Sequence, residues 1–405
     1  MTHKPYFWHF SAMLLALVAG QANATSLPRQ SSAPESCIVP NGWLEPGAAK
    51  SRSIAAPKLL ASVAERDFVL LGEQHDNADH HRWQLQTLAG LHAYRPDMVI
   101  GFEMFPRRLQ PVLDRWVAGK LSVREFLTQA EWDTVWTFPP ELYLPLFEFA
   151  RINRIPMLAL NVDRSLIKAI GEKGWDQVPA SERADLGRPA PASVAYRDLL
   201  FGIYSTHTPT PRRTAAKIGP ADKGFESFVD AQLTWDRAMA EVLASRAGPV
   251  KHGRKPLVVG IMGSGHLRFG HGVPHQLRAL GFSQIATLLP KSDDANCDDL
   301  APGLADAVFA LPAAATAPAL PPRLGVALED ADGAVRIQSI TPGSLAERSG
   351  ILAGDRLIEI AGSPPLNTAA VIAMIRRQPP GTWVPLRVQR GSTAVDLVVR
   401  FPVRP

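Results

Sequence analysis

Five short apolar runs alternate with longer stretches of helical periodicity, and this alternation restricts the fold more than any other feature of the sequence. The runs cover residues 68–71, 98–102, 155–160, 257–262 and 285–289. Alternating strands and helices are typical of an α/β domain, here a largely parallel sheet with helices on both faces. Only one run falls between residues 106 and 250. We therefore expect a helical insertion in that stretch.

Polar residues follow four of the predicted strands, at the point where each strand ends. They include Glu73 and His75 after the first run, Glu103 after the second and His266 after the fourth. The third run is followed by Asn161 and Asp163. Because ligands bind at the carboxyl edge of open parallel sheets, we expect Glu73, His75, Glu103 and His266 to form one pocket.

Two carboxylates and two imidazoles suit two kinds of chemistry. They can hold a divalent metal ion, or a carboxylate–histidine pair can activate water. Each residue also has a structural interpretation, as a helix cap, an ion-pair partner or part of a tight turn. The sequence contains no HExxH, GxSxG or P-loop motif, and no GxGxxG follows a strand. Nucleotide binding is therefore not expected.

A second candidate site lies in the predicted insertion. Tyr196 and the segment with Tyr204 and His207 are followed by basic residues that include Arg212 and Arg213. Tyrosinate and histidine are both ligands of haem iron, and arginine can bind haem propionates by charge-assisted hydrogen bonds. The alternative is an exposed basic loop.

The first 24 residues have the pattern of a signal peptide. A weakly basic start precedes a short apolar stretch, and Ala22-Asn23-Ala24 is a small-residue cleavage site. We expect cleavage there and a periplasmic mature protein. Residues 25–54 would form an extended arm, 55–298 the α/β domain, 299–322 a linker rich in alanine and proline, and 323–405 a small domain.

The two cysteines, Cys37 and Cys297, lie on either side of the α/β domain. An oxidising compartment permits a disulfide between them, and two unpaired cysteines are the alternative. The formal charge of +5 is spread along the chain without a basic run or a recognisable motif. Nucleic-acid binding is therefore not expected.

The large domain resembles the ChaN family, a haem-binding branch of a superfamily that includes Tiki, TraB and erythromycin-esterase-like proteins. The matching segments are LLGEQHDN (70–77), GFEMFPR (101–107), ALN (159–161), FVDAQLTWDRAMA (228–240) and GSGHLRFGHGVP (263–274). The resemblance implies haem or iron uptake, a haem ligand on the insertion and paired subunits that share stacked haems. Tyr204 and His207 are the expected ligands here. It also implies that Glu73, His75, Glu103 and His266 form the pocket used for hydrolysis in other branches.

The small domain resembles a PDZ domain. The matching segments are RLGV (323–326), SLAERSG (344–350) and GDRLI (354–358). In such a domain the backbone N–H groups of Leu324, Gly325 and Val326 would hold the C-terminal carboxylate of a partner peptide. Residues 367–377 would form the helix beside the peptide groove.

Three functions follow from these observations. The first is a periplasmic haem- or iron-binding protein, with a PDZ domain that recruits a protein partner. The second is a metal-dependent hydrolase or protease that uses the strand-end pocket. The third is a scaffold without catalytic activity.

Overall fold

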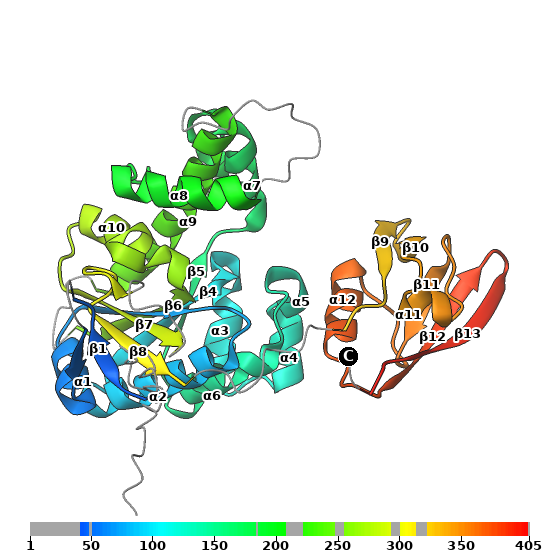
Figure 1. The fold of residues 1–405 in the computed structure, drawn as a ribbon, viewed down its shortest axis with the longest axis horizontal. Coiled ribbons are helices and arrows are strands. Elements are labelled where there is room, and N and C mark those ends of the chain that lie inside the picture. The colour runs from blue at the N-terminus through cyan, green and yellow to red at the C-terminus, as the bar shows by residue number, and fades with distance from the viewer. Residues whose placement is uncertain are drawn as a thin grey trace, which may run out of the picture. The chain divides into compact units, whose positions relative to one another are not determined.

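The computed structural model describes residues 41–47, 51–183, 185–207, 222–247, 255–292, 300–312 and 322–403. Its large domain is built on an eight-stranded sheet (Figure 1). From one edge to the other, the strands are β2 (Arg52–Ile54), β1 (Trp43–Glu45), β8 (Ala307–Leu311), β7 (Ile285–Ser292), β3 (Phe68–Glu73), β6 (Leu257–Gly263), β4 (Met98–Pro106) and β5 (Met157–Asn161).

The sheet is largely parallel, as the sequence predicts. The six strands from β8 to β5 run in one direction, and β1 pairs antiparallel with both of its neighbours. At the centre, β6 lies between β3 and β4, with Leu71 opposite Ile261 and Gly101 opposite Gly260. The carboxyl ends of these three strands therefore meet at one edge of the sheet.

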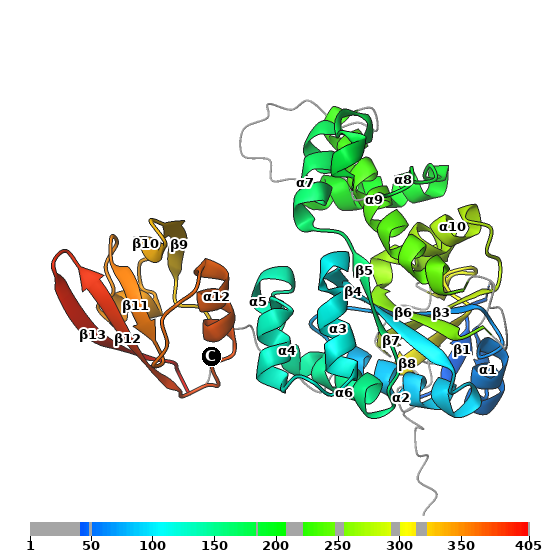
Figure 2. The same ribbon diagram turned by 180° about the vertical axis from the view of Figure 1, so that it is seen from behind.

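Helices cover both faces of the sheet, because successive strand side chains point to opposite faces. Along β3, Val69 and Leu71 join one hydrophobic cluster, whereas Phe68 and Leu70 join another. The first cluster lies beneath α1 (Ala56–Val63), α2 (Ala78–Tyr94), α3 (Gln110–Val117) and α6 (Leu144–Ile152), and the second beneath α9 (Lys223–Arg246) and α10 (Gly272–Ala279). Figures 1 and 2 show these two layers from opposite sides.

Among the described residues between β4 and β6, β5 is the only strand and the other regular elements are helical, which confirms the predicted insertion. Besides α3, α6 and α9, its helices are α4 (Val123–Gln129), α5 (Trp132–Val135), α7 (Arg164–Lys173) and α8 (Val194–His207). Side-chain caps fix several of the helix starts. Asn77 accepts backbone N–H groups at the start of α2, Ser122 and Glu125 form a capping box on α4, and Asp222 accepts the N–H of Gly224 on α9.

Short 3₁₀ turns connect many of these elements. They are η1 (Arg107–Leu109), η2 (Pro140–Leu142), η3 (Trp175–Gln177), η4 (Ala180–Glu182), η5 (Ser264–His266) and η6 (Arg268–Gly270).

The sheet extends beyond the limits that the sequence suggests for the large domain. Strands β1 and β2 lie in the predicted arm, and β8 lies in the predicted linker. Aromatic contacts explain their place in the domain, because Trp43 on β1 packs 5.1 Å from Phe309 on β8 and 5.8 Å from Trp83 on α2. Short strands in a stretch rich in alanine and proline have too little periodicity to be read from sequence.

The small domain contains a five-stranded antiparallel sheet and two helices. In order, its strands are β13 (Thr393–Arg400), β12 (Trp383–Arg390), β11 (Arg356–Ile360), β10 (Ala334–Ile340) and β9 (Val326–Ala331). Its helices are α11 (Leu345–Arg348) and α12 (Thr368–Arg376), and Asn367 caps α12. Its hydrophobic core includes Val335, Val388 and Val399. Strand β9 is at the edge of the sheet.

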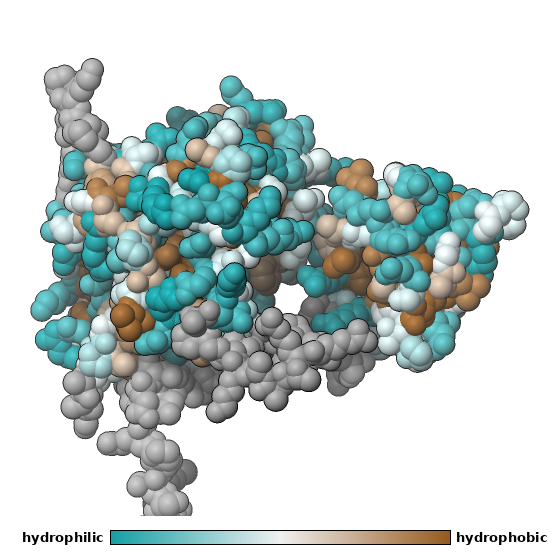
Figure 3. Space-filling view, turned by 90° about the horizontal axis from the view of Figure 1, so that it is seen from above, coloured by the Kyte–Doolittle hydropathy of each residue, from teal (hydrophilic) through white to brown (hydrophobic). Residues whose placement is uncertain are grey.

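In the part of the chain that the structure describes, no helix has both the length and the apolar character to cross a membrane. The face seen in Figure 3 is mainly hydrophilic, with hydrophobic residues in small separate patches.

Candidate functional site

Three central strands bring the predicted pocket residues together. Glu73 is the last residue of β3 and lies opposite Gly263, the last residue of β6. Glu103 lies on β4, and its Oε2 accepts the backbone N–H of Gly263 at 2.6 Å. His266 follows β6 in the turn η5. The carboxylates and imidazoles therefore meet at the carboxyl edge of the sheet, where the sequence places them.

Glu73 is the most heavily bonded residue of this cluster. Its Oε1 accepts hydrogen bonds from Nδ1 of His75 at 2.7 Å and from the hydroxyl of Tyr143 at 2.8 Å. Its Oε2 accepts one from the side-chain amide of Gln84 at 3.1 Å and lies 3.3 Å from Nδ1 of His81. Burial alone would raise the pKa of Glu73, but the bonds from His75 and His81 outweigh it and lower that pKa to about 2. Glu73 is therefore a buried anion at neutral pH.

A hydrogen bond at Nδ1 and two aromatic contacts hold the His75 ring in one orientation. Its Nδ1 is bound to Glu73, and its ring packs 4.7 Å from Trp136 and 5.2 Å from Phe138. A Cβ on Gly263 would lie 3.0 Å from Cε1 of His75, so glycine gives the ring room against β6. Burial opposes protonation of His75, but the Glu73 hydrogen bond and the nearby Glu103 charge raise its pKa overall.

His266 lies between two carboxylates. Its Nδ1 is 2.6 Å from Oδ1 of Asp236, and its Nε2 is 3.4 Å from Oε1 of Glu103. Burial alone would lower the pKa of His266, yet the charges and hydrogen bonds of Glu103 and Asp236 raise it to about 10. His266 is therefore an imidazolium at neutral pH. Oε1 of Glu103 is buried and has no hydrogen-bond partner among the described residues.

Several residues that form hydrogen bonds with this cluster were not among the predicted pocket residues. Asp236, on α9, is fully buried and also accepts a hydrogen bond from the Tyr196 hydroxyl at 2.8 Å. Tyr196, one of the candidate haem residues, therefore belongs to the strand-end cluster. Asp236 lies in the segment FVDAQLTWDRAMA (228–240). The resemblance of this segment to the ChaN family is a signal that could have identified Asp236 as a site residue. No sequence signal pointed to Tyr143 or Gln84.

The four pocket residues were also expected as possible metal ligands. Nδ1 of His75 and Nδ1 of His266 are each bound to a carboxylate. Within the described ranges, no group of three or more histidine, cysteine, aspartate or glutamate residues is placed to hold a metal ion. The tentative metal assignment of Glu73, His75, Glu103 and His266 thus gains no support from this geometry.

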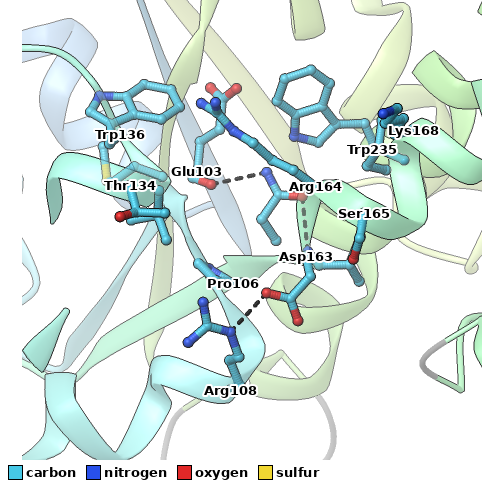
Figure 4. Close-up of a pocket in the computed structure, with 15 residues that line it drawn as sticks. Glu103, Pro106, Arg108, Thr134, Trp136, Asp163, Arg164, Ser165, Lys168 and Trp235 are labelled. Carbon is cyan, nitrogen blue, oxygen red and sulfur yellow. Dashed lines mark hydrogen bonds and ion pairs between the residues drawn. The ribbon is translucent and has the colours of Figure 1, made fainter. Parts of the chain in front are cut away.

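A cleft of about 450 Å³ reaches Glu103 from the surface. Figure 4 shows Glu103 between the indoles of Trp136 and Trp235, with Ser165 and Lys168 of α7 on the same side as Trp235 and the side chain of Arg164 extending from α7 towards Glu103. Arg108 and Asp163 form an ion pair of 2.8 Å beside the cleft. The cleft gives small molecules a route to the carboxylate of Glu103.

Tyr204 lies on α8 in the helical insertion and is partly buried. Its ring packs 5.6 Å from Phe225 and 5.5 Å from Phe228 on α9, and its hydroxyl donates a hydrogen bond of 3.4 Å to Oδ1 of Asp222. The structure therefore places a phenol oxygen on an aromatic surface of the insertion, beside a carboxylate.

The other predicted residues of that site are not described. The side chain of His207, at the end of α8, and all of Arg212 and Arg213 lie outside the described residues, as do Cys37 and Cys297.

The small domain has a groove of about 440 Å³ between β9 and α12. It is lined by apolar side chains of both elements, among them Val326, Leu328, Val371, Ile372 and Ile375. Gly325 has a φ of +79°, and a Cβ there would lie 2.3 Å from Cβ of Ser344, so this loop position requires glycine. The side chain of Leu324 lines the groove but is mostly buried in the domain core.

Two known families match these two domains. Residues 59–277 match the family described as haem-binding uptake, Tiki superfamily, ChaN, and residues 336–390 match the PDZ domain. No curated protein matches the chain.

Three solved structures share between 18% and 20% sequence identity with the matched parts of the chain. The structure titled "Cofacial heme binding to ChaN of Campylobacter jejuni" is 20% identical, with 66% of this chain and 95% of that chain covered and a TM-score of 0.48. The HtrA3 PDZ domain bound to a phage-derived ligand is 18% identical, with 19% and 82% covered and a TM-score of 0.18. The HtrA-type protease AlgW with a decapeptide is 20% identical with a TM-score of 0.19, and the match covers 20% of this chain and only 29% of the protease.

Proposed function

Because the chain belongs to the ChaN family of haem-binding uptake proteins, in the Tiki superfamily, we propose that it binds ferric haem in the periplasm through Tyr204 of its insertion. The observation that carries this proposal is the environment of Tyr204. Of the tyrosines described in the insertion, Tyr143 and Tyr196 are fully buried and bound to Glu73 and Asp236, whereas Tyr204 is only partly buried. Tyr204 is therefore the tyrosine of the insertion that retains some exposure.

The residues around Tyr204 fit this role. Phe225 and Phe228 of α9 pack against the Tyr204 ring, and Phe228 is partly buried. The carboxylate of Asp222 is placed to accept the phenol proton. A bound ferric haem supplies a cationic iron, which favours an anionic phenolate ligand. Arg212 and Arg213 would contribute positive charge for the propionates. The same proposal includes pairing of two subunits that share stacked haems, as the family resemblance implies.

Titration of the purified full-length protein with ferric haem tests the proposal. We expect saturable binding at micromolar haem, with an absorption spectrum typical of tyrosinate-bound ferric iron. Absence of saturable binding would refute haem binding by this chain.

We propose further that the small domain recruits a protein partner by its C-terminus. The support is the apolar groove beside the edge strand β9, since an edge strand can pair with an extended peptide. The loop of Leu324, Gly325 and Val326 would bind the terminal carboxylate with its backbone N–H groups.

Amidation of the peptide C-terminus tests this assignment. It removes the negative charge, so the affinity of a peptide with an apolar last residue should fall at least tenfold, or about 1.4 kcal/mol. Calorimetry with free and amidated forms of one peptide makes the comparison. Equal affinities would show that the loop does not bind the carboxylate.

Hydrolysis at the strand-end cluster is a second candidate function. One observation favours it: Nε2 of the His266 imidazolium lies 3.4 Å from Oε1 of Glu103, and Glu103 lines an open cleft. Glu103 can take a proton from a water molecule that attacks a carbonyl carbon, and His266 can donate one to the leaving oxygen. Hydrolysis of small esters that is abolished in Glu103→Gln would support this candidate. Absence of turnover by the wild-type protein over a panel of esters would count against it.

A further inference from the structure

Two residues that line the cleft carry buried polar atoms without a hydrogen bond. Glu103 is 1% exposed, and its Oε1 has only the 3.4 Å ion pair with His266 and no hydrogen bond in the described part of the chain. The indole Nε1 of Trp235 is also buried and has no hydrogen-bond partner there. A buried polar atom without a hydrogen bond costs free energy, which a ligand in the cleft would recover.

The walls of the cleft suit a flat apolar group. Trp136 and Trp235 lie on opposite sides of Glu103 in Figure 4. Trp136 is held by its edge contact with His75 at 4.7 Å, and Trp235 by its contact with His266 at 5.2 Å. Both indoles are therefore fixed in place before a ligand enters, which reduces the entropy lost on binding.

Arg164 is the cation of the cleft that has no anionic partner among the described residues. Arg108 and Asp163 neutralise each other, and Arg108 also binds Glu131. Arg164, by contrast, has no ion-pair or hydrogen-bond partner among the described residues, and it extends into the cleft in Figure 4. Lys168 also lines the cleft and forms an ion pair of 3.8 Å with Glu172. An anionic group is thus favoured at the guanidinium of Arg164.

From these features we propose that the cleft is a binding site for a small amphipathic carboxylate with a flat apolar body and a hydroxyl or amide N–H. The carboxylate would lie at the guanidinium of Arg164, the apolar body against the indole walls, and the donor group towards Oε1 of Glu103. Nε1 of Trp235 supplies a hydrogen bond to an oxygen of the ligand. The inference depends neither on haem binding nor on hydrolysis, because it rests on the cleft alone.

Equilibrium dialysis of the full-length protein with 6-hydroxy-2-naphthoate tests this inference, and two related probes define the roles of its groups. 2-Naphthol lacks the carboxylate, and 2-naphthoate lacks the hydroxyl. We expect saturable binding of the hydroxynaphthoate that is at least tenfold tighter than that of either related probe.

Variants separate specific binding from general adsorption. Arg164→Gln should weaken hydroxynaphthoate binding at least fivefold and leave 2-naphthol binding within twofold. The matched control is Arg124→Gln, which removes an exposed arginine of α4 that does not line the cleft and should leave all three affinities unchanged. Trp235→Phe keeps an aromatic wall but removes the N–H, and should weaken the hydroxynaphthoate two- to fivefold.

Three outcomes would overturn the inference. One is the absence of saturable binding by the wild-type protein, and another is an equal effect of Arg164→Gln and Arg124→Gln. The third is displacement of the probe by haem in direct competition, which would make the cleft part of the haem site. Failure of haem binding with the probe results intact would instead refute only the proposed function.

Discussion

Most charged residues of the strand-end cluster have a partner of opposite charge, and this pairing decides how the cluster responds to pH. Glu73 lies beside His75 and His81, while His266 lies between Asp236 and Glu103. Both nitrogens of His81 also face acceptors, Gln84 and the backbone oxygen of His75. Such a cluster is stable only while its carboxylates are ionised and its imidazoles are protonated.

The pKa values of two of these residues predict a bell-shaped dependence of stability on pH. The pKa of Glu73 is lowered from 4.5 to about 2, so its contribution is complete above pH 4.5 and is lost as the pH falls towards 2. The pKa of His266 is raised from 6.5 to about 10, so its contribution is complete below pH 6.5 and is lost as the pH rises towards 10. The thermal midpoint of the large domain should therefore be highest between about pH 4.5 and 6.5.

Calorimetric scans across this range measure the effect. In His266→Gln the decline on the alkaline side should become shallower than in the wild-type protein, while the decline on the acid side remains. An unchanged alkaline limb in this variant would mean that His266 is not the group that titrates.

At the scale of elements, glycines fix the backbone of some loops, and the loop at Gly325 of the small domain shows this most clearly. Gly325 combines a positive φ with a clash that any Cβ would make with Ser344. Gly391 also has a positive φ, of +59°, but a Cβ there would meet nothing within 4 Å. Alanine at Gly391 would therefore add backbone strain alone, whereas alanine at Gly325 would add both backbone strain and a steric clash.

Gly325→Ala should abolish peptide binding, because the loop must move to relieve the clash. Gly391→Ala carries a comparable backbone cost, roughly 1 kcal/mol, yet should leave peptide affinity unchanged. Thermal unfolding and peptide titration of both variants test this. Equal affinities of the two variants would show that the loop geometry at Gly325 does not govern binding.

The sequence predicts the strands and their polar ends well, because a buried parallel strand is a continuous apolar run and the residue after it lies at the sheet edge. Glu73, Glu103 and His266 could be placed in this way. Asp236 could not, since the face that α9 turns to the sheet depends on how the insertion folds back. Tyr143 precedes α6 in a segment without periodicity, and β1 and β8 are short strands held by tertiary contacts of Trp43 and Phe309.

At the scale of the whole molecule, the predicted export to the periplasm and the predicted disulfide depend on each other. A bridge between Cys37 and Cys297 would close a loop around most of the large domain and requires an oxidising compartment. In the chain-entropy model, a loop of this length contributes on the order of 4–5 kcal/mol.

Thiol titration of the denatured protein, isolated from the periplasm without reductant, should find no free thiol, and reduction should release two. Amino-terminal sequencing of the same sample should give Thr25 as the first residue. Two titratable thiols before reduction would refute the bridge, and a retained leader would refute cleavage after Ala24.

The central claim is that Tyr204 binds the haem iron, and a comparison of three proteins tests it directly. Ferric haem is titrated into the wild-type protein, Tyr204→Phe and Tyr94→Phe, which alters a tyrosine of α2 that is 47% exposed. Phenylalanine keeps the ring packing against Phe225 and Phe228 and removes only the oxygen. We predict that the wild-type protein and Tyr94→Phe give the same tyrosinate spectrum and affinity. Tyr204→Phe should lose the spectrum while its circular dichroism is unchanged. A wild-type spectrum and affinity in Tyr204→Phe would contradict the claim.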